Sequence, residues 1–228
     1  MTSTTTERVA LVTGGSDGLG LGLCRALADQ GWRVITDGRS EGKFTEAGLP
    51  DGVTVIVGDL TDGDHRERLL AEVASHGRLD LLVHNASTLG PVPMRALAEV
   101  DIADLQHVWR TNIGGPLVLT SSLLPWLTSA DGVLLSISSD AAVNHYETWG
   151  LYGASKAALD HVTLSYGAET GMRAYAVDPG DMRTAMHQDA FPGEDISDRP
   201  LPETVVPHLL TLLDARPESG RYQAEDFS

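Results

Sequence analysis

A glycine-rich turn between an apolar segment and a helix-like segment constrains this chain most. Residues 9–12 read Val-Ala-Leu-Val, residues 13–20 read Thr-Gly-Gly-Ser-Asp-Gly-Leu-Gly, and a run of helix formers follows. Four consecutive apolar residues indicate a buried strand. Glycines let the backbone approach a pyrophosphate, and the start of a helix offers unpaired N–H groups, so this context predicts a phosphate site. The alternative is a turn that binds no ligand.

Strand-like and helix-like segments alternate along the whole chain. The predicted strands cover residues 8–13, 33–36, 53–57, 79–84, 132–137, 172–177 and 221–223. The predicted helices cover residues 18–30, 64–75, 102–127, 151–168 and 203–214. This alternation predicts an α/β fold with a single doubly wound parallel sheet of about seven strands and helices on both faces.

The length of 228 residues predicts one domain over residues 1–228. Residues 1–6 form a short polar tail without an apolar signal region, and no run is long enough to span a bilayer, so a cytoplasmic location is the default expectation. Residues 187–202 are the least regular part of the sequence. A loop of that length in a compact domain is usually functional or mobile.

Charge and composition exclude several classes of function. The formal net charge of −16 argues against nucleic acid or an anionic membrane as a partner. The histidines lack metal-ligand spacing, so no metal site is predicted. Cys24 is the only cysteine in the sequence, so the chain cannot form an internal disulfide bond.

A tyrosine and a lysine stand four residues apart in a helix-like run. Tyr152 and Lys156 therefore lie on the same helix face. The usual pKa of a phenol is about 10, and a neighbouring ammonium lowers it. The pair is predicted to pass protons to and from a substrate oxygen. The alternative is a solvated helix edge.

Together these motifs resemble the short-chain dehydrogenase/reductase family. Its glycine motif T-G-x-x-x-G-x-G is met by Thr13, Gly14, Gly18 and Gly20, and its motif Y-x-x-x-K is met by Tyr152 and Lys156. Further family positions are matched, in order, by Asp59, Asn112, Ser139, Pro179, Gly180 and Thr184. The resemblance implies a Rossmann-type domain, an NAD(P)-dependent oxidoreductase, a substrate lid over residues 187–202 and a homodimer or homotetramer.

The resemblance also implies roles for the catalytic residues. Tyr152 would exchange a proton with the substrate oxygen, Ser139 would orient that oxygen, and Lys156 would lower the pKa of Tyr152 and hold the nicotinamide ribose. Asn112 would hold a water next to Lys156; the alternative is a polar residue that bends its helix. Ser138 competes with Ser139, but only one of the two faces the pocket at a strand end, and spacing to Tyr152 favours Ser139.

The segment after the second predicted strand indicates which cofactor binds. A carboxylate at the end of this strand accepts a hydrogen bond from the free ribose hydroxyl of NAD, whereas an arginine there binds the additional phosphate of NADP. The family's acid position holds Gly38, and Arg39 follows, with Ser40 as a further donor. NADP(H) is therefore favoured. NAD(H) stays open, because Asp37 is one residue away and Asp17 stands where NADP-dependent relatives often carry a basic residue.

Further contacts are implied by position within the motifs. The additional cofactor contacts are Ser16, Asp17, Leu19, Leu60, Asn85, Ala86, Ser87 and Met182. Where the family reads N-N-A-G, this chain reads His84-Asn85-Ala86-Ser87, so a serine side chain stands near the nicotinamide and shapes the pocket. Thr184 would reach the nicotinamide carboxamide or cap a short helix. The substrate contacts implied are Ser139, His145, Tyr146, Trp149, Tyr152 and His187.

The expected function is NADPH-dependent reduction of a ketone or aldehyde to an alcohol, with a small-molecule substrate. The first alternative is an NAD-dependent alcohol dehydrogenase that runs in the oxidative direction. A non-catalytic NADP-binding sensor usually lacks Tyr, Lys or Ser, and this chain has all three. Sugar-nucleotide epimerases need a larger C-terminal region, and enoyl reductases have a longer gap between tyrosine and lysine. A structural subunit would bind no nicotinamide cofactor at all.

Overall fold

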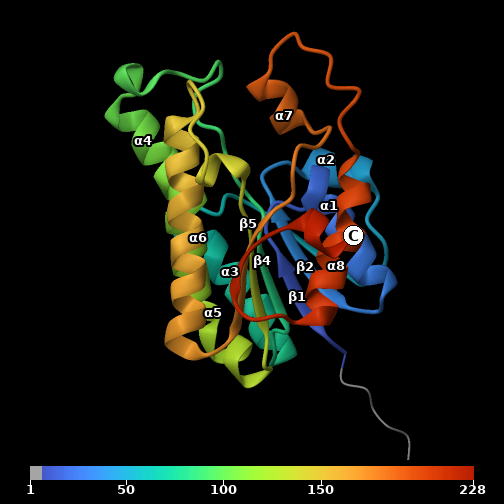
Figure 1. Cartoon of the computed structure of the whole chain (residues 1–228). Coiled ribbons are helices and arrows are strands. Elements are labelled where there is room, and N and C mark those ends of the chain that lie inside the picture. The colour runs from blue at the N-terminus through green and yellow to red at the C-terminus, as the bar shows by residue number, and fades with distance from the viewer. Residues whose placement is uncertain (1–6) are drawn as a thin grey trace, which may run out of the picture.

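Seven parallel strands form the centre of the computed structural model, which describes residues 7–228 (Figure 1). In chain order they are β1 (Val9–Val12), β2 (Arg33–Gly38), β3 (Val53–Val57), β4 (Leu81–His84), β5 (Val133–Ile137), β6 (Arg173–Asp178) and β7 (Gly220–Gln223). Their order in the sheet is β3-β2-β1-β4-β5-β6-β7. The predicted Rossmann fold is confirmed, and the strand ends shift by at most two residues. The tail predicted over residues 1–6 lies outside the described residues.

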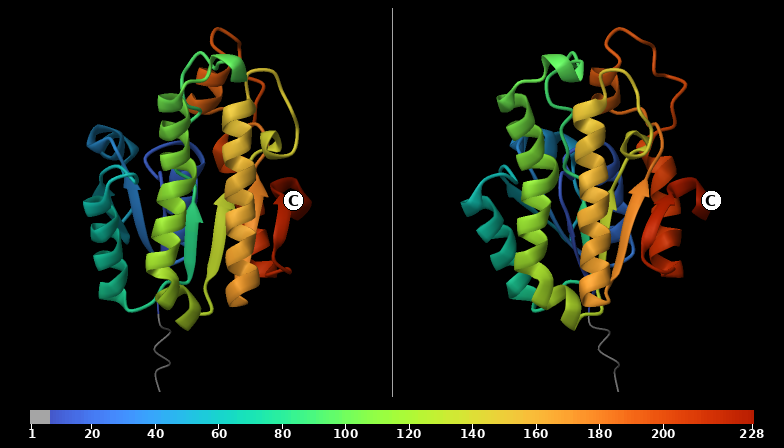
Figure 2. Two further views of the ribbon diagram at one scale, coloured as in Figure 1. Left: turned by 90° about the vertical axis from the view of Figure 1, so that its left-hand side faces the viewer. Right: turned by 60° about the vertical axis from the view of Figure 1, so that its left-hand side comes forward.

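Helices join the strands and cover both faces of the sheet (Figure 2). They are α1 (Gly18–Asp29), α2 (Glu41–Ala47), α3 (Gly63–His76), α4 (Ile102–Trp109), α5 (Gly115–Ser129), α6 (Gly150–Thr170), α7 (Ala185–Ala190) and α8 (Pro202–Ala215). Side chains alternate along the strands, so each face of the sheet has its own core. Leu11 and Leu82 pack toward α3 and α5, whereas Val12 and Val83 pack toward α1 and α8.

The helix predicted over residues 102–127 is divided into α4 and α5. The two helices are joined by a π-helical segment over Arg110–Gly114. Asn112 lies in this segment and is buried. A π-helical segment inside a longer helix frequently marks a functional site. Asn112 therefore stands in the irregular segment that separates the two helices.

Two short helices are absent from the sequence-based prediction. α2 buries only Phe44 and has too few turns to show a periodic pattern. α7 covers the first part of the segment predicted as a loop over residues 187–202. Its N-cap is Thr184, whose Oγ1 accepts from the backbone N–H of His187 at 3.1 Å. The capping alternative for Thr184 is therefore seen in the structure.

The strand order places a crevice at the carboxyl ends of the central strands. β1 pairs with β2 on one side and with β4 on the other, so the connections after β1 and after β4 run to opposite sides of the sheet. In open α/β sheets, ligands bind outside the strand ends at such a switch point. The glycine turn follows β1 directly, so the predicted phosphate site lies in this crevice.

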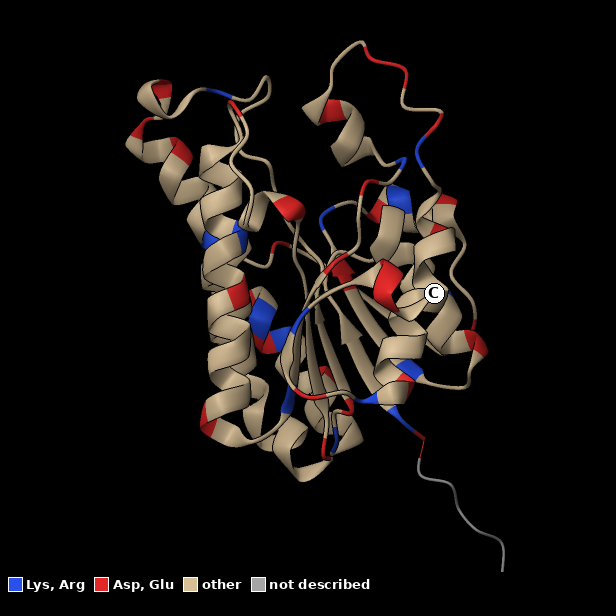
Figure 3. Ribbon diagram, viewed as in Figure 1, with Lys and Arg blue, Asp and Glu red and all other residues tan. Residues whose placement is uncertain are grey.

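Charged residues of both signs are spread over the molecule (Figure 3). Acidic residues recur along the segment between α7 and α8, at Glu194, Asp195 and Asp198. Among the helices of residues 7–228, none combines the length and the hydropathy needed to cross a bilayer.

Candidate active site

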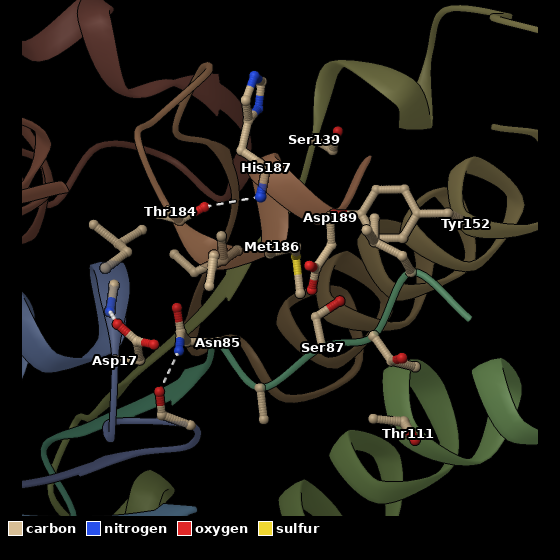
Figure 4. Close-up of a pocket in the computed structure, with 18 of the residues that line it drawn as sticks. Asp17, Asn85, Ser87, Thr111, Ser139, Tyr152, Thr184, Met186, His187 and Asp189 are labelled. Carbon is tan, nitrogen blue, oxygen red and sulfur yellow. Dashed lines mark hydrogen bonds between the residues drawn. The ribbon is translucent and has the colours of Figure 1, made fainter. Parts of the chain in front are cut away.

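The crevice opens into a cavity of about 520 Å³. This volume is in the range of small-molecule and cofactor sites. Most of the predicted site residues line it: Gly14, Ser16, Asp17, Gly18, Leu19, Arg39, Asp59, Leu60, Asn85, Ala86, Ser87, Ser139, Trp149, Tyr152, Lys156, Pro179, Gly180, Met182, Thr184 and His187. Figure 4 shows side chains from the glycine turn, the end of β4, α6 and α7 arranged around one space. Gly20, Ser40, Asn112, His145 and Tyr146 do not line it.

The glycine turn is held by the neighbouring strands. The side-chain amide of Asn85 donates to the carbonyl oxygens of Thr13 and Gly14, at 2.9 and 3.0 Å. A Cβ on Gly20 would lie 2.4 Å from both Gly14 O and Asn85 Nδ2, so only glycine fits there. Gly20 therefore serves the turn by close packing, and Asn85 serves it by holding its backbone.

Asp37 anchors the same turn from β2. Its Oδ1 accepts from the backbone N–H of Gly14 at 2.8 Å, and its Oδ2 lies 2.9 Å from His65 Nε2. Both Asp37 and His65 are buried. Asp37 therefore supports the turn with one carboxylate oxygen and holds His65 with the other, and it also lines the cavity.

Two basic side chains line the cavity beyond the end of β2. Arg39 lines it directly, and Lys43 on α2 pairs with Asp17 at 2.7 Å between Nζ and Oδ2. Asp17 is also the N-cap of α1, with Oδ1 accepting from Gly18 N at 2.8 Å. Ser40 caps α2 and accepts from Lys43 N at 3.3 Å, so its hydroxyl serves the helix rather than the cavity.

The proposed proton donor lies deep in the opposite half of the cavity. Tyr152 is only 7% exposed, and burial raises the pKa of its phenol above the usual range, while the hydroxyls of Ser87 and Ser139 lower it. Lys156 is buried beside it, with its Nζ 5.6 Å from the Tyr152 ring centroid. This Nζ donates to the carbonyl oxygen of Ile137 at 2.7 Å. The lowered pKa expected for Tyr152 is thus not seen, because burial outweighs its polar contacts.

Burial also acts on the lysine. It lowers the pKa of Lys156 to about 8, and the charge of Asp160 opposes this effect. His84 is buried nearby, and its pKa falls to about 3 because of burial and the charge of Lys156. His84 is therefore neutral at physiological pH, with its Nε2 2.6 Å from Thr120 Oγ1.

The two consecutive serines after β5 have separate partners. Ser138 Oγ donates to Asp160 Oδ2 at 2.8 Å. Ser139 Oγ donates to Asp140 Oδ1 at 3.1 Å and accepts from the backbone N–H of Ala141 at 3.2 Å. Both serines line the cavity, so the expectation that only one of them faces it is wrong. Ser138 is the more deeply buried of the two, and its hydroxyl is held by Asp160.

Asn112 supports the site from behind. Its Nδ2 donates to Thr88 O and Ser155 Oγ, both at 2.9 Å, and its Oδ1 accepts from Thr88 N at 2.9 Å. The side chain thus joins the π-helical segment, the chain after β4 and α6. All of these contacts are structural, and the Asn112 side chain lies one layer outside the cavity wall.

The predicted substrate contacts divide into two groups. Trp149 and His187 line the cavity, and Trp149 packs edge-on against Tyr152 with 5.8 Å between ring centroids. His145 and Tyr146 are exposed and lie outside the lining. Tyr146 donates to Asp140 Oδ2 at 2.7 Å, so it orders the loop before α6 instead.

Some lining residues were not predicted from the sequence. Lys43 and Asp189 are the clearest examples, and Figure 4 shows the Asp189 carboxylate directed into the cavity near Ser87. Both belong to the two short helices that the periodic pattern does not reveal. A basic residue soon after Arg39 was the only local signal for Lys43. For Asp189 the signal was the run of acidic residues in and around the segment 187–202, which disfavours a highly anionic substrate.

Comparison with known proteins agrees with this geometry. Residues 8–195 match the short chain dehydrogenase family. The chain is 32% identical to the oxidoreductase YciK of Escherichia coli K12, over 94% of this chain and 90% of that protein. It is 33% identical to the (S)-benzoin-forming benzil reductase IRC24 of Saccharomyces cerevisiae, over 80% and 74% of the two chains.

Solved structures of the family share the same architecture. A short-chain dehydrogenase from Escherichia coli CFT073, complexed with NADPH, superposes with a TM-score of 0.87 at 31% identity, covering 96% of each chain. The sheet order, the glycine turn and the match over residues 8–195 all lead to one assignment. This chain is an oxidoreductase of the short-chain dehydrogenase/reductase family.

Proposed function

We propose that this enzyme reduces a ketone or aldehyde to an alcohol with NADPH, using Tyr152 as the acid. The observation that carries the proposal is the position of Tyr152, which is buried in the wall of the cavity beside Lys156 and lines the same cavity as Ser139 and the glycine turn. A buried acid next to a second hydroxyl suits protonation of an oxygen that gains negative charge. The named activity of the yeast relative, a benzil reductase, is of the same kind.

The residues present fit a dinucleotide. A Cβ on Gly14 would lie 2.9 Å from Ala86 Cα, so the turn is built for close backbone approach. The start of α1 directs N–H groups toward the cavity, which suits a pyrophosphate. Asp59 and Leu60 would flank the adenine, and Lys156 and Thr184 the nicotinamide end.

NADPH is proposed over NADH because of the basic side chains that follow β2. Arg39 and Lys43 line the part of the cavity where an adenosine ribose would carry its phosphate. Both carboxylate oxygens of Asp37 are engaged, by Gly14 N and by His65, which favours a role in holding the turn over one at the ribose. The E. coli CFT073 structure that resembles this chain contains NADPH.

Each catalytic side chain has one task in this scheme. When bound, NADPH would be the source of the hydride. Ser139 holds the carbonyl oxygen by a hydrogen bond, and Tyr152 donates its proton to that oxygen as the negative charge develops. Lys156 lends positive charge to the resulting phenolate, and its own pKa of about 8 allows it to exchange a proton at neutral pH.

We also propose that residues 187–202 close over the substrate and that the protein forms a homodimer or homotetramer. The lid proposal is supported by His187, Asp189 and Ala190, which lie on α7 and line the cavity. The assembly proposal is supported by Trp109 on α4 and Val118 on α5, which leave apolar surface exposed. Sedimentation analysis tests the assembly.

NADPH oxidation in the presence of a panel of ketones and aldehydes tests the function. We expect turnover with at least one neutral carbonyl and loss of turnover in Tyr152→Phe, with unchanged NADPH binding. Saturable NADPH binding without turnover of any carbonyl or alcohol would favour a non-catalytic sensor. Near-normal turnover in folded Tyr152→Phe would remove Tyr152 from the mechanism.

A further inference from the structure

The hydroxyl of Ser139 is already engaged in this structure. It donates to Asp140 Oδ1 at 3.1 Å, and its oxygen accepts from the backbone N–H of Ala141 at 3.2 Å. Ser139 and Asp140 both line the same cavity as Tyr152. A hydroxyl has a single proton to donate. The Ser139 O–H therefore has to leave Asp140 before it can hold the oxygen of a carbonyl substrate.

The heavy atoms around this hydrogen bond are held in place, so only the hydroxyl proton has to move. The backbone oxygen of Ser139 accepts from Arg221 Nη2 at 2.9 Å and from Ala142 N at 3.0 Å. The second carboxylate oxygen of Asp140, Oδ2, accepts from the Tyr146 hydroxyl at 2.7 Å. Rotation about the Cβ–Oγ bond of Ser139 thus frees Asp140 Oδ1 without displacing the carboxylate.

The freed carboxylate oxygen needs a new donor. Asp140 is half-buried and lines the cavity, so a bound substrate limits the access of water to it. An acceptor that loses its hydrogen bond in such a place is destabilised, and the loss is larger when the acceptor is charged. The substrate is the group that draws the Ser139 hydroxyl away, and a donor on the substrate restores the hydrogen bond to Oδ1.

The distance between the two protein oxygens indicates where on the substrate that donor lies. Ser139 Oγ and Asp140 Oδ1 are 3.1 Å apart. Two ligand atoms that form hydrogen bonds with them side by side therefore lie about 3 Å from each other as well. Oxygens on adjacent carbons have this separation when they lie on the same side of the bond between those carbons. A hydroxyl next to the carbonyl group thus reaches Oδ1 and carries the proton that Oδ1 has lost.

We propose that the substrate is an α-hydroxy carbonyl compound, whose carbonyl oxygen accepts from Ser139 and whose hydroxyl donates to Asp140 Oδ1. The inference rests on the proposed function and names the substrate class of that site. The carbonyl carbon gains a hydride and its oxygen gains the Tyr152 proton, with NADPH as the reductant that is oxidised to NADP⁺. The product is a vicinal diol. The O–H bonds of Ser139 and of the substrate hydroxyl stay intact, and only their acceptors change.

Three ketones that share one skeleton test the proposal. Phenacyl alcohol carries the α-hydroxyl, its methyl ether keeps the oxygen without the proton, and acetophenone lacks both. Hydroxyacetone, methoxyacetone and acetone form an aliphatic series of the same design. The ether oxygen activates the carbonyl much as the hydroxyl does, so the ratio of kcat/KM for the alcohol to kcat/KM for the ether isolates the hydrogen bond. We expect this ratio to be about tenfold in the wild-type enzyme, with acetophenone or acetone also below the alcohol.

Substitutions of Asp140 should change this ratio. Asp140→Ala removes the acceptor and should bring the ratio below about twofold. Asp140→Asn keeps a neutral acceptor, serves where Asp140→Ala does not fold, and should give about threefold. Tyr146→Phe is the matched control, because it removes the donor to Oδ2 and leaves Oδ1 in place. Its ratio should equal that of the wild-type enzyme.

Two results would overturn the proposal. One is a wild-type ratio below about twofold. The other is an unchanged ratio in the folded Asp140 variants, because a purely structural role of Asp140 lowers kcat/KM for all three ketones alike. Absence of turnover of every carbonyl compound overturns the proposed function instead. Calorimetric titration of the NADPH-saturated enzyme then still decides the role of Asp140, since phenacyl alcohol should bind about tenfold more tightly than its methyl ether.

Discussion

Arg221 Nε contacts Asp160 Oδ2 at 3.2 Å and so joins the last strand of the sheet to the helix that carries Tyr152 and Lys156. Arg221 Nη2 also donates to Ser139 O at 2.9 Å and approaches Asp178 Oδ2 at 3.5 Å. One guanidinium thus ties the ends of β5 and β6 to α6. Burial raises the pKa of both Asp160 and Asp178, so each carboxylate depends on this cation.

Arg221→Ala should therefore destabilise the fold and impair the site together. Removing one partner of a buried ion pair costs about 3–5 kcal/mol. The Arg221 side chain is 24% exposed, so we expect about 2–3 kcal/mol in urea unfolding. Arg173→Ala is the matched control, because Arg173 pairs with Glu218, which is 88% exposed, and should lose less than about 1 kcal/mol. Equal losses in the two variants would contradict the role assigned to Arg221.

Lys156→Met should abolish turnover and yet stabilise the protein at neutral pH. Burial lowers the pKa of Lys156 from 10.5 to about 8, so the folded state holds an ammonium at a cost of about 3 kcal/mol. Loss of the hydrogen bond to Ile137 O offsets about 1 kcal/mol of the gain. We expect a net gain of about 2 kcal/mol in urea unfolding at pH 7.

The sign of the pH dependence follows from the same values. Below the folded pKa of about 8, the wild-type protein carries the full cost of the buried ammonium. As the pH rises from about 8 toward 10.5, the unfolded chain still binds the proton that the folded state has released, and the cost disappears. The advantage of Lys156→Met should shrink over this interval. An advantage that grows over it would contradict the assignment.

The Asp37→Asn substitution should weaken the binding of NADPH and the binding of NADH equally. Asp37 holds Gly14 N and His65, so the substitution loosens the turn under the pyrophosphate and does not act on the ribose. We expect Kd to rise about tenfold for NADPH and for NADH, with their ratio unchanged. In Arg39→Ala only the Kd for NADPH should rise, because the charge that would meet the ribose phosphate is lost. Fluorescence titration measures the Kd of NADPH and of NADH for both variants. A rise in the Kd of NADH alone in Asp37→Asn would show that Asp37 accepts from the ribose hydroxyl of NAD(H).

Local pattern explains why the fold and the catalytic pair were predictable. Four buried residues in β1, the positive φ of Gly14 and the four-residue spacing of Tyr152 and Lys156 all lie within short stretches of chain. Glycine at a positive φ and a helix face are local properties, so the sequence alone reveals them. The order of the motifs then indicated the family.

What the sequence did not reveal depends on contacts between distant segments. Asp37 and His65 meet across 28 residues, and Arg221 reaches Asp160 across 61. The direction of Lys156 toward Ile137 O, and of Ser87 toward Asn112, is decided by packing between α6, the π-helical segment and the strand ends. Neither periodicity nor motif spacing reveals contacts of this kind. The sequence therefore predicts a lowered pKa for Tyr152, whereas burial in the folded protein raises it.

Asp189→Asn should change which substrates the enzyme accepts. The Asp189 carboxylate points into the cavity. Asp189 is exposed and lines the cavity, so its charge raises the energy of a bound anion moderately, whereas a neutral carbonyl is little affected. We expect kcat/KM for a carbonyl compound that carries a carboxylate to rise about three- to tenfold, and kcat/KM for a neutral ketone to stay within about twofold. Asp198→Asn is the control, because Asp198 pairs with Arg199 and does not line the cavity. If both variants raise kcat/KM for the anion equally, the effect comes from the overall charge of the protein and Asp189 is not the selecting group.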